Sequence, residues 1–442
     1  MSSGLFSPPR VNRAVDGWGQ RSLRSMLSAR GERNRSDLPL LTVARERGVF
    51  VRSAEDANHN AIPEDLSNYK VARRGDLVIN KMKAWQGSLG LAPVDGIVSP
   101  AYFVFSADFA VPEFGEYLLR SKPYVAKFAA ASDGVRIGQW DLDIARMREI
   151  RVRLPAPGEQ TAIVKYLAHA NARIDNAIAA KRRLITILEE QRAAVRDKLI
   201  EEGAWPRQRL KTLLLRVDQG VSPQAENQVP GPGEWGVVKS GCVNNGRFRA
   251  DQVKRLPDGF VVPTALCIAE GDLLVSRANG SADLVGSAAR VVGLMHQSIL
   301  SDKTFRLVLR PDIDTDFLAI SMNSRSYRQQ VLAAISGAEG LGNNLPLSAL
   351  RRMEFSVPPI DIQRNIVKRE HVESRAIERT SNRVSTEILL LEEFRTRLVA
   401  DVVTGQVDVR AVAETLPDPI MPDVSLDEDW TDLDDLLGHE DD

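Results

Sequence analysis

The sequence predicts an α/β (α+β) protein built as a pseudo-two-fold internal repeat, in which two tandem mixed α/β domains alternate with two long helices. Residues 148–200 align without a gap with residues 351–403, at a constant offset of 203, and 12 of the 53 positions are identical. Average residue usage gives about three identities by chance. Gly75–Asp76–Leu77 and Gly271–Asp272–Leu273 form a second, weaker repeat upstream of the two copies. The fold class therefore follows from the repeat before any single element is assigned.

Each copy of the main repeat contains an unusually long helical stretch. Pro155 and Pro157 stand before the first stretch, and Pro358 and Pro359 stand before the second, where proline ends a strand or opens a helix. Residues 159–202 and 360–404 then contain neither proline nor glycine. A helix of more than 40 residues is about 65 Å long at 1.5 Å per residue.

Apolar residues in both stretches recur at heptad spacing, which is typical of a coiled coil. The seam of the second helix contains Ile377, Val384, Leu391 and Leu398, and that of the first contains Ile174, Leu188 and Val195, with Lys181 interrupting it. Because both helices belong to one chain, the simplest partner for each is the other. The alternative is two unrelated amphipathic helices, each packed on its own domain.

The segments between the helices predict short strands with Gly–Asp or Asp–Gly turns. The β-rich runs are 76–80, 97–98, 101–105, 272–276, 288–292 and 304–309. Glu113–Ala131 and Asp316–Ala334 each predict one helix. The expected boundaries are a disordered N-terminus at 1–17, a first domain at 18–155, a helical arm at 156–203, a second domain at 204–357, a second arm at 358–405, and an acidic tail at 406–442.

The net charge of −1 on 442 residues hides an uneven distribution. Residues 411–442 contain 12 acidic residues and no Lys or Arg, so residues 1–410 have a net charge of +11. A basic body of this kind can attract polyanions such as nucleic acid. The tail predicts either a disordered, solvating end or a short acidic helix that docks on a basic surface or on a partner.

Other classes of protein are disfavoured by what the sequence lacks. No apolar run approaches the ~18 residues of a membrane span, and the N-terminus has no secretory signal, so we expect a cytoplasmic protein. Cys242 and Cys267 are the only cysteines, the five histidines are scattered, and no phosphate-binding loop occurs. We therefore expect no catalytic residue, no metal site and no cofactor in this chain, which favours a binding protein.

Polar loops at strand ends are the best candidates for contacting DNA. Lys and Arg reach phosphates or guanine edges, Asn and Gln pair with adenine edges, and aromatic rings stack. The candidates are Asn80, Lys81, Lys83, Trp85, Gln86, Arg136 and Gln139 in the first domain, and Arg277, Asn279, Lys303, Asn343 and Asn344 in the second. Single loops of this composition are common on surfaces, but their similar placement in both domains favours a function.

The repeated arms resemble the specificity subunit of type I restriction-modification enzymes. The first carries Arg153–Leu154–Pro155–Ala156–Pro157–Gly158–Glu159–Gln160 followed by Leu188–Glu189–Glu190, and the second carries Val357–Pro358–Pro359 and Gln363 followed by Leu391–Glu392–Glu393. The run 78–87 and the run Val98–Ser99–Pro100–Ala101–Tyr102 are similar to a target-recognition pattern, which adds Tyr102 to the candidates. Ile362 stands where this pattern has Glu, and the acidic tail departs from the family.

The resemblance implies a non-catalytic subunit in which each domain reads one half of a bipartite target in double-stranded DNA. The two helices would pair as an antiparallel coiled coil, set the spacer and dock the methyltransferase (modification) subunits, two in number. Restriction subunits would join through the complex, and AdoMet, ATP and Mg²⁺ would belong to these partners. The alternatives from other classes are a coiled-coil scaffold whose duplicated domains bind proteins, and an enzyme with an unfamiliar site.

Overall fold

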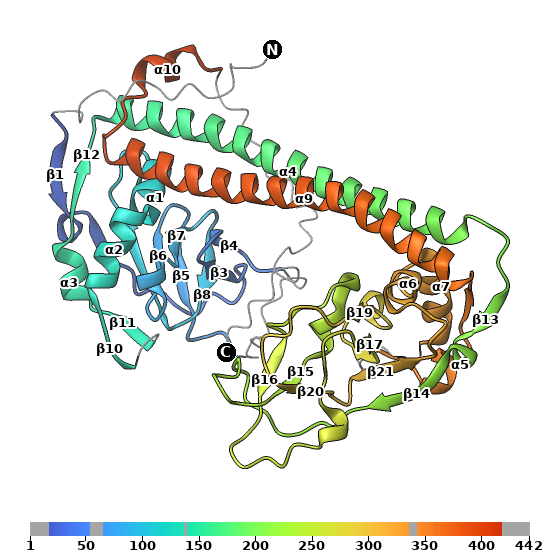
Figure 1. Ribbon diagram of the computed structural model, residues 1–442. Helices are drawn as coiled ribbons and strands as arrows, with labels where there is room; N and C mark the ends of the chain where they lie inside the picture. The colour runs from blue at the N-terminus through green and yellow to red at the C-terminus, as the bar shows by residue number, and fades with distance from the viewer. Residues whose placement is uncertain (1–16, 54–64, 137–138, 336–342, 418–442) are drawn as a thin grey trace. The chain divides into compact units, whose positions relative to one another are not determined.

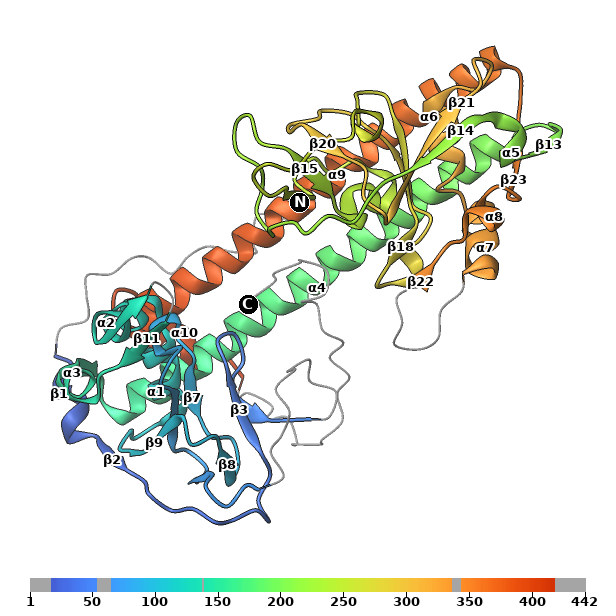
Figure 2. The same cartoon turned by 90° about the horizontal axis from the view of Figure 1, so that it is seen from below.

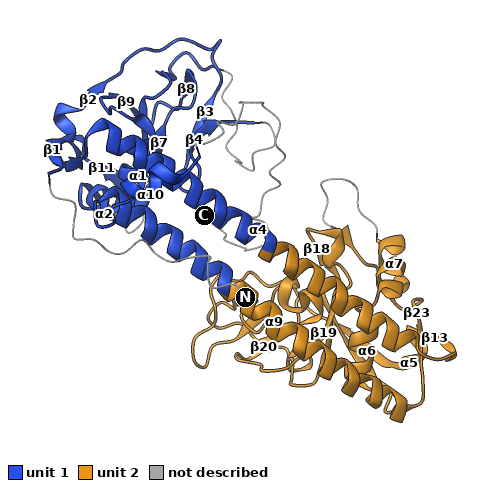
Figure 3. Ribbon diagram, turned by 90° about the horizontal axis from the view of Figure 1, so that it is seen from above, with its two compact units in different colours: residues 1–180, 387–442 blue, residues 181–386 orange. Residues whose placement is uncertain are grey.

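The computed structural model describes residues 17–53, 65–136, 139–335 and 343–417. The chain forms two compact units, one of residues 1–180 with 387–442 and the other of residues 181–386 (Figure 3). The predicted disordered N-terminus, apart from Gly17, and residues 418–442 of the acidic tail lie outside the described residues. The part of the tail that is described contains a short helix, α10 (Arg410–Thr415).

The first unit contains a four-stranded antiparallel sheet whose strand order is β2-β9-β6-β7. Figure 1 labels β6 and β7, and Figure 2 labels β2 and β9. These strands are Leu27–Ala29, Tyr102–Ala107, Leu77–Asn80 and Leu89–Leu91. Four two-stranded pairs accompany the sheet: β1 (Gly19–Ser22) with β12 (Arg151–Leu154), β3 (Leu41–Ala44) with β4 (Gly48–Val51), β5 (Lys70–Ala72) with β8 (Gly96–Val98), and β10 (Ser132–Arg136) with β11 (Gln139–Leu142). The short helices are α1 (Pro112–Arg120), α2 (Lys122–Ala130) and α3 (Ile144–Glu149).

The second unit repeats this plan. Its four-stranded antiparallel sheet has the order β14-β21-β17-β19, with strands Leu214–Gln219, Thr304–Leu309, Leu273–Ser276 and Ala288–Arg290. A second sheet has the order β16-β15-β20, with strands Val253–Arg255, Gly236–Val238 and Ser298–Ile299. Two further pairs are β13 (Arg207–Arg209) with β23 (Glu354–Ser356), and β18 (Ala278–Asn279) with β22 (Asn343–Asn344). The short helices are α5 (Leu210–Leu213), α6 (Thr315–Ser321), α7 (Arg325–Ala334) and α8 (Leu347–Leu350).

The prediction of one helix at 113–131 and one at 316–334 was wrong, because each stretch folds as two helices. Ser121 is extended (φ −65°, ψ 146°) between α1 and α2, and Pro123 lies in the first turn of α2. Proline fits that position, because the backbone N–H that it lacks would have no partner within the helix there. In the second unit, the Ser324 hydroxyl accepts a hydrogen bond from the Tyr327 N–H and caps α7.

The two long helices, α4 (Pro157–Glu201) and α9 (Ile360–Val403), confirm the prediction for the arms (Figures 1 and 2). In the first unit, α4 packs its Leu167 with Leu398 and Val402 of α9 in one buried core. In the second unit, Leu199 near the end of α4 packs with Ile366 near the start of α9. The early part of one helix thus meets the late part of the other in each unit.

This pairing is antiparallel, which confirms the predicted fold class. Polar contacts follow the same order: Asp175 pairs with Arg395 in the first unit, and Glu202 Oε2 lies 2.6 Å from the Arg369 guanidinium in the second. Of the heptad residues, Ile174, Val384 and Leu398 are buried, and Leu188, Val195, Ile377 and Leu391 are half-buried. The alternative of helices that pack only on their own domains is wrong.

The repeated glutamine of each arm fastens a long helix to its neighbouring domain. The Gln160 side-chain amide donates to the Pro155 carbonyl (2.9 Å) and accepts from the Val111 N–H (3.2 Å). The Gln363 side chain donates to the Pro358 carbonyl (2.8 Å) and accepts from the Asp314 N–H (2.8 Å). Both glutamines are buried. The Pro and Gln identities of the repeat therefore mark the two ends of the same hydrogen bond.

We expect Gln363→Ala to lower the free energy of unfolding by about 2–3 kcal/mol, because it takes this partner from the buried Pro358 carbonyl and from the part-buried Asp314 N–H. Urea unfolding followed by circular dichroism measures the change. Gln228→Ala is the matched control, since Gln228 is exposed and its loss should cost less than about 0.5 kcal/mol. Equal losses in the two variants would contradict the proposed role of the glutamine.

The repeated Gly–Asp–Leu motif closes an identical turn in both domains. Gly75 and Gly271 have φ values of 84° and 90°, which favour glycine. The Asp76 carboxylate accepts from the Arg73 N–H (2.8 Å), and Asp272 accepts from the Ala269 N–H (2.9 Å). Each aspartate also binds an arginine, Arg30 and Arg306 respectively. The motif thus holds the start of the central strands β6 and β17.

Candidate nucleic-acid interface

The candidate loops lie at equivalent places in the two domains. The loop after β6 is held by a hydrogen bond from the Leu142 N–H to the Lys81 carbonyl (3.0 Å). The loop after β17 is held in the same way, from the Leu345 N–H to the Arg277 carbonyl (2.8 Å). The two donor residues, Leu142 and Leu345, lie just before the short helices α3 and α8. Two stretches far apart in sequence therefore meet at one strand end in each domain.

In the first domain, the structure brings most of the predicted residues together. Asn80 ends β6 and lies opposite Tyr102 of β9 in the sheet register. Lys81 Nζ forms an ion pair with Asp141 Oδ2 at 2.6 Å. The Trp85 and Trp140 rings contact each other, with centroids 5.2 Å apart. These contacts join the 80–86 loop to the β10–β11 hairpin.

The remaining candidates of this domain surround that junction. Lys83 is exposed and Gln86 is half-buried, both in or next to the short 3-10 helix 84–86. Arg136 and Gln139 face each other in the β10–β11 register. The sequence-based choice of residues left out Trp140, Asp141 and the exposed Met82, although Trp140 ends the same run as Arg136 and Gln139. Nothing in the sequence indicates that Trp85 and Trp140, which lie far apart along the chain, pack against each other.

The second domain gathers its candidates around the β18–β22 pair (Figure 2). Asn279 lies opposite Asn343 in this pair, and the Asn343 side chain donates to the Gly280 carbonyl (3.0 Å). The Arg277 guanidinium donates to the Asp302 carbonyl (3.0 Å), and Lys303 is exposed. Asn344 Oδ1 is buried without a hydrogen-bond partner among the described residues. The loops thus converge here as well, while their contact with DNA stays a prediction.

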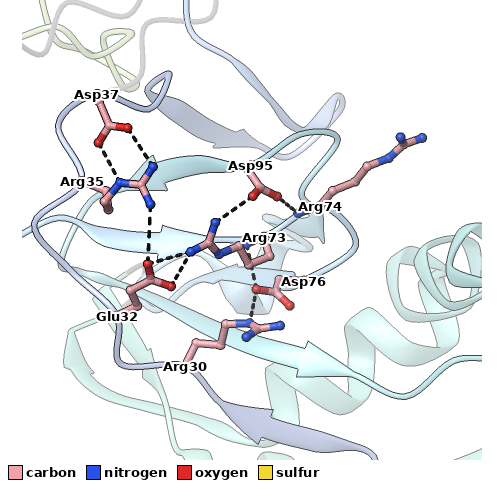
Figure 4. Close-up of polar contacts among 8 residues, drawn as sticks. All are labelled: Arg30, Glu32, Arg35, Asp37, Arg73, Arg74, Asp76 and Asp95. Carbon is pink, nitrogen blue, oxygen red and sulfur yellow. Dashed lines mark hydrogen bonds and ion pairs between the residues drawn. The ribbon is translucent and has the colours of Figure 1, made fainter.

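An arginine–carboxylate network shows that many of the basic residues are already paired (Figure 4). The Arg73 guanidinium binds Glu32 (2.7 Å) and Asp95 (2.8 Å), and Arg35 binds Asp37 (2.7 Å). The hydrogen bonds that the Arg73 guanidinium donates to Glu32 and, to a smaller extent, to Asp95 raise the pKa of Arg73. The Arg74 side chain, by contrast, points away from these carboxylates. These ion pairs are neutral and already cancel in the net charge of +11, so Arg35 and Arg73 are not among the cations that are free to meet a phosphate.

The described part of the chain contains no grouping of three or more His, Cys, Asp or Glu residues that could hold a metal ion. No helix within the described ranges is both long and apolar enough to cross a membrane. Cys242 is buried, which raises its pKa to about 12, so this thiol stays protonated near neutral pH.

We expect Lys83→Ala and Lys303→Ala each to weaken DNA binding without changing the preferred sequence, because an exposed lysine that meets DNA contacts phosphate. The slope of log affinity against log salt concentration should fall by about 0.9 for each lost phosphate contact. Titrations at several salt concentrations measure it. Lys211→Ala, which removes an exposed lysine from α5, should leave the slope unchanged. A lowered slope in the Lys211 variant alone would contradict this placement of the interface.

Known proteins that are similar to this chain match most of its length. No family model matches it. It is 24% identical over 360 residues to the type I restriction enzyme EcoKI specificity subunit of Escherichia coli (strain K12), covering 73% of each chain. It is 27% identical over 166 residues to the EcoEI specificity subunit of Escherichia coli, covering 37% of this chain and 28% of the relative.

A solved structure from a study of complex assembly and conformational transition in the type I R-M system shares the fold. It covers 89% of this chain and 100% of its own, with a TM-score of 0.60 and 16% sequence identity. The resemblance in the repeated arms is thereby confirmed: this chain is similar to the specificity subunits of type I restriction enzymes over most of its length.

Proposed function

We propose that this chain is the non-catalytic DNA-specificity subunit of a type I restriction-modification complex. The observation that carries this function is the duplicated loop junction, which places Lys81 and Arg277 at the same strand end of two equivalent domains. Two similar but non-identical reading surfaces in one chain suit a target with two different halves. The relatives named above are specificity subunits, which supports the same conclusion.

Residues 18–155 and 204–357 serve as the two target-recognition domains, and each reads one half of a bipartite site in double-stranded DNA. Gln86, Arg136, Arg277 and Asn343 are the candidates for base contacts, where a substitution costs about 1–3 kcal/mol of discrimination at one position. Lys81, Lys83 and Lys303 are the candidates for phosphate contacts. The Trp85–Trp140 pair supplies an aromatic surface beside them.

The two arms, 156–203 and 358–405, set the spacer between the half-sites and dock two methyltransferase subunits. Exposed apolar side chains on both helices support a docking role, since such groups favour burial against a partner. They are Leu184 and Ile187 on α4, and Val372, Leu389 and Leu390 on α9. Restriction subunits join through the same complex. AdoMet, ATP and Mg²⁺ bind these partners rather than this chain, and the complex acts in the cytoplasm, where its DNA lies.

Footprinting of the complex with its methyltransferase tests this function. We expect two protected half-sites separated by a gap of fixed length, and protection that disappears when either half-site is altered. Protection without sequence preference would contradict the proposal. A protein-binding scaffold, the alternative function, would show no steep loss of DNA affinity as salt rises. The bipartite motif found by sequencing the methylated bases of the host genome supplies the target for the assay.

A further inference from the structure

A cavity of about 460 Å³ in the second unit lies between α4, α9 and α6 and the short helical segment at Ser240–Gly246. Arginine dominates its charged lining. Five arginines face three carboxylates, and the arginines are Arg192, Arg196, Arg247, Arg290 and Arg375. All of these residues belong to the second unit. The cavity plays no part in the recognition loops described above.

The carboxylates of the cavity are already engaged by other groups. Glu378 pairs with Arg247 (3.2 Å), and Asp316 pairs with Arg290 (3.3 Å). Glu370 is buried and accepts a hydrogen bond from the Ser374 hydroxyl (2.6 Å). Three arginines are left without an ion pair among the described residues, and because the Ser374 hydroxyl is neutral and leaves the charge of Glu370 in place, the lining has a surplus of two positive charges for a further anion.

These three cations are Arg192, Arg196 and Arg375. Within the described ranges, none of them has a carboxylate oxygen within 4.0 Å, and Arg192 reaches only the Ser374 hydroxyl (3.3 Å). The Nε of Arg196 is buried and has no hydrogen-bond partner among the residues that the structure describes. Burial lowers the pKa of Arg196, and Arg192 adds repulsion, while Asp197 and Glu370 offset these effects only in part. An anion in the cavity would satisfy these groups.

The internal repeat provides a control for this arrangement. At the offset of 203, Arg196 corresponds to Val399, Arg375 to Ala172, His371 to Ala168, and the buried Glu370 to Leu167. Arg192 corresponds to Arg395, which has a carboxylate partner of its own in Asp175. The antiparallel helix pair therefore forms in the first unit without these charges. Their presence in the second unit is not a requirement of the coiled coil.

We propose that this cavity is a binding site for a phosphate group, held by Arg192 and Arg196 at its floor and by Arg375 at its rim. Guanidinium groups present planar sets of N–H donors that match phosphate oxygens, and such charge-assisted hydrogen bonds are the strongest available to an anion. Asn245, which also lines the cavity, carries an amide donor. The site goes beyond the proposed reading of DNA bases, because it lies on the helical arms.

Isothermal titration of the full chain with inorganic phosphate, at constant ionic strength balanced by chloride, tests the site. We expect saturable binding that Arg196→Val weakens at least about tenfold, since this variant installs the residue of the first unit and removes charged hydrogen bonds. Arg375→Ala, at an exposed position where a substitution should change stability by less than about 0.5 kcal/mol, should also weaken phosphate binding. Arg364→Ala removes an exposed charge from α9 outside the cavity and should leave binding unchanged.

An equal response in the Arg364 variant, unaltered binding in both cavity variants, or the absence of saturable binding would overturn the proposal. A competition experiment distinguishes the two possible sources of the phosphate group. Displacement of inorganic phosphate by a short DNA duplex would assign the site to a backbone phosphate, whereas unchanged binding would assign it to a free phosphate or phosphate monoester. Neither result bears on the footprint that tests the proposed function, so the two can fail separately.

Discussion

Deleting seven residues from each long helix, 179–185 from α4 and 383–389 from α9, should shorten the gap between the two half-sites by about three base pairs and leave each half-site unchanged. Seven residues correspond to about 10.5 Å of helix at 1.5 Å per residue, and one base pair occupies about 3.4 Å of DNA. A deletion of one heptad from each helix preserves the apolar seam, because the seam repeats every seven residues. Binding to the original target should fall by at least about a thousandfold, to the non-specific level.

Selection from a pool of duplexes with varied spacers measures this change. Deleting 179–185 alone is the control, because it shifts one seam against the other and should destroy the helix pair rather than alter the spacing. An unchanged spacer in the double deletion would refute the role of the helices as a ruler, even if both half-sites were still recognised.

Replacing Arg306 with alanine should lower the free energy of unfolding of the second domain by about 3 kcal/mol, through the loss of a buried guanidinium and the groups that it satisfies. Arg306 lies on the strand β21 and is only 8% exposed. It binds Asp218 (2.6 Å), Asp272 (3.2 Å) and the carbonyls of Cys267 and Ala265 (both 2.7 Å). Two carboxylates and two carbonyls would each lose one interaction at once, although Asp218 keeps Arg216 and Asp272 keeps the Ala269 N–H.

Arg216→Ala is the matched control, since Arg216 is exposed but binds the same Asp218 at 3.1 Å. Its loss should cost less than about 1 kcal/mol. Urea unfolding at neutral pH separates the two variants. Equal losses would show that the buried position of Arg306 contributes nothing.

The pH dependence of the Arg306 variant gives a second measurement. Burial opposes the charged form of Asp218, but its hydrogen bonds with Arg306 and Arg216 prevail and lower its pKa in the folded state. A carboxyl whose folded pKa is lowered stabilises the fold above the ordinary aspartate value of about 3.9 and loses that contribution as the pH falls through the folded pKa. The difference in stability between the native protein and Arg306→Ala should therefore shrink below about pH 4.

The elements predicted best from the sequence were those with a long or strict pattern. The helices could be predicted because more than 40 consecutive residues lack proline and glycine, and because the heptads of Ile377 to Leu398 repeat. The run 304–309 was found at both ends, because its apolar β-rich residues form a central strand. The break at Ser121 was missed, since the residues on both sides continue a helical pattern and the signal is a single Lys–Pro step.

The geometry of the candidate site could be predicted only in part. Lys81 and Arg277 were found from composition and from their place after a strand. The pairing of Ala278–Asn279 with Asn343–Asn344 could not be predicted, because more than 60 residues separate the two segments and neither is a strand by its own pattern. The Nε of Arg196, which lacks a hydrogen-bond partner within the described part of the chain, could not be predicted either, because in the sequence Arg196 is one of many basic residues of a helix.

The bond that anchors each candidate loop runs from main chain to main chain, from Leu142 to Lys81 and from Leu345 to Arg277. Such a bond does not depend on which side chain follows the strand. Substitutions in the loop can therefore alter the bases that are preferred while the backbone path and the surrounding sheet stay the same. A protein anchored in this way can acquire a new target by point mutation in one domain while the other half of its target stays the same, at a cost in stability only where the replaced side chain makes its own contacts, as Lys81 and Trp85 do.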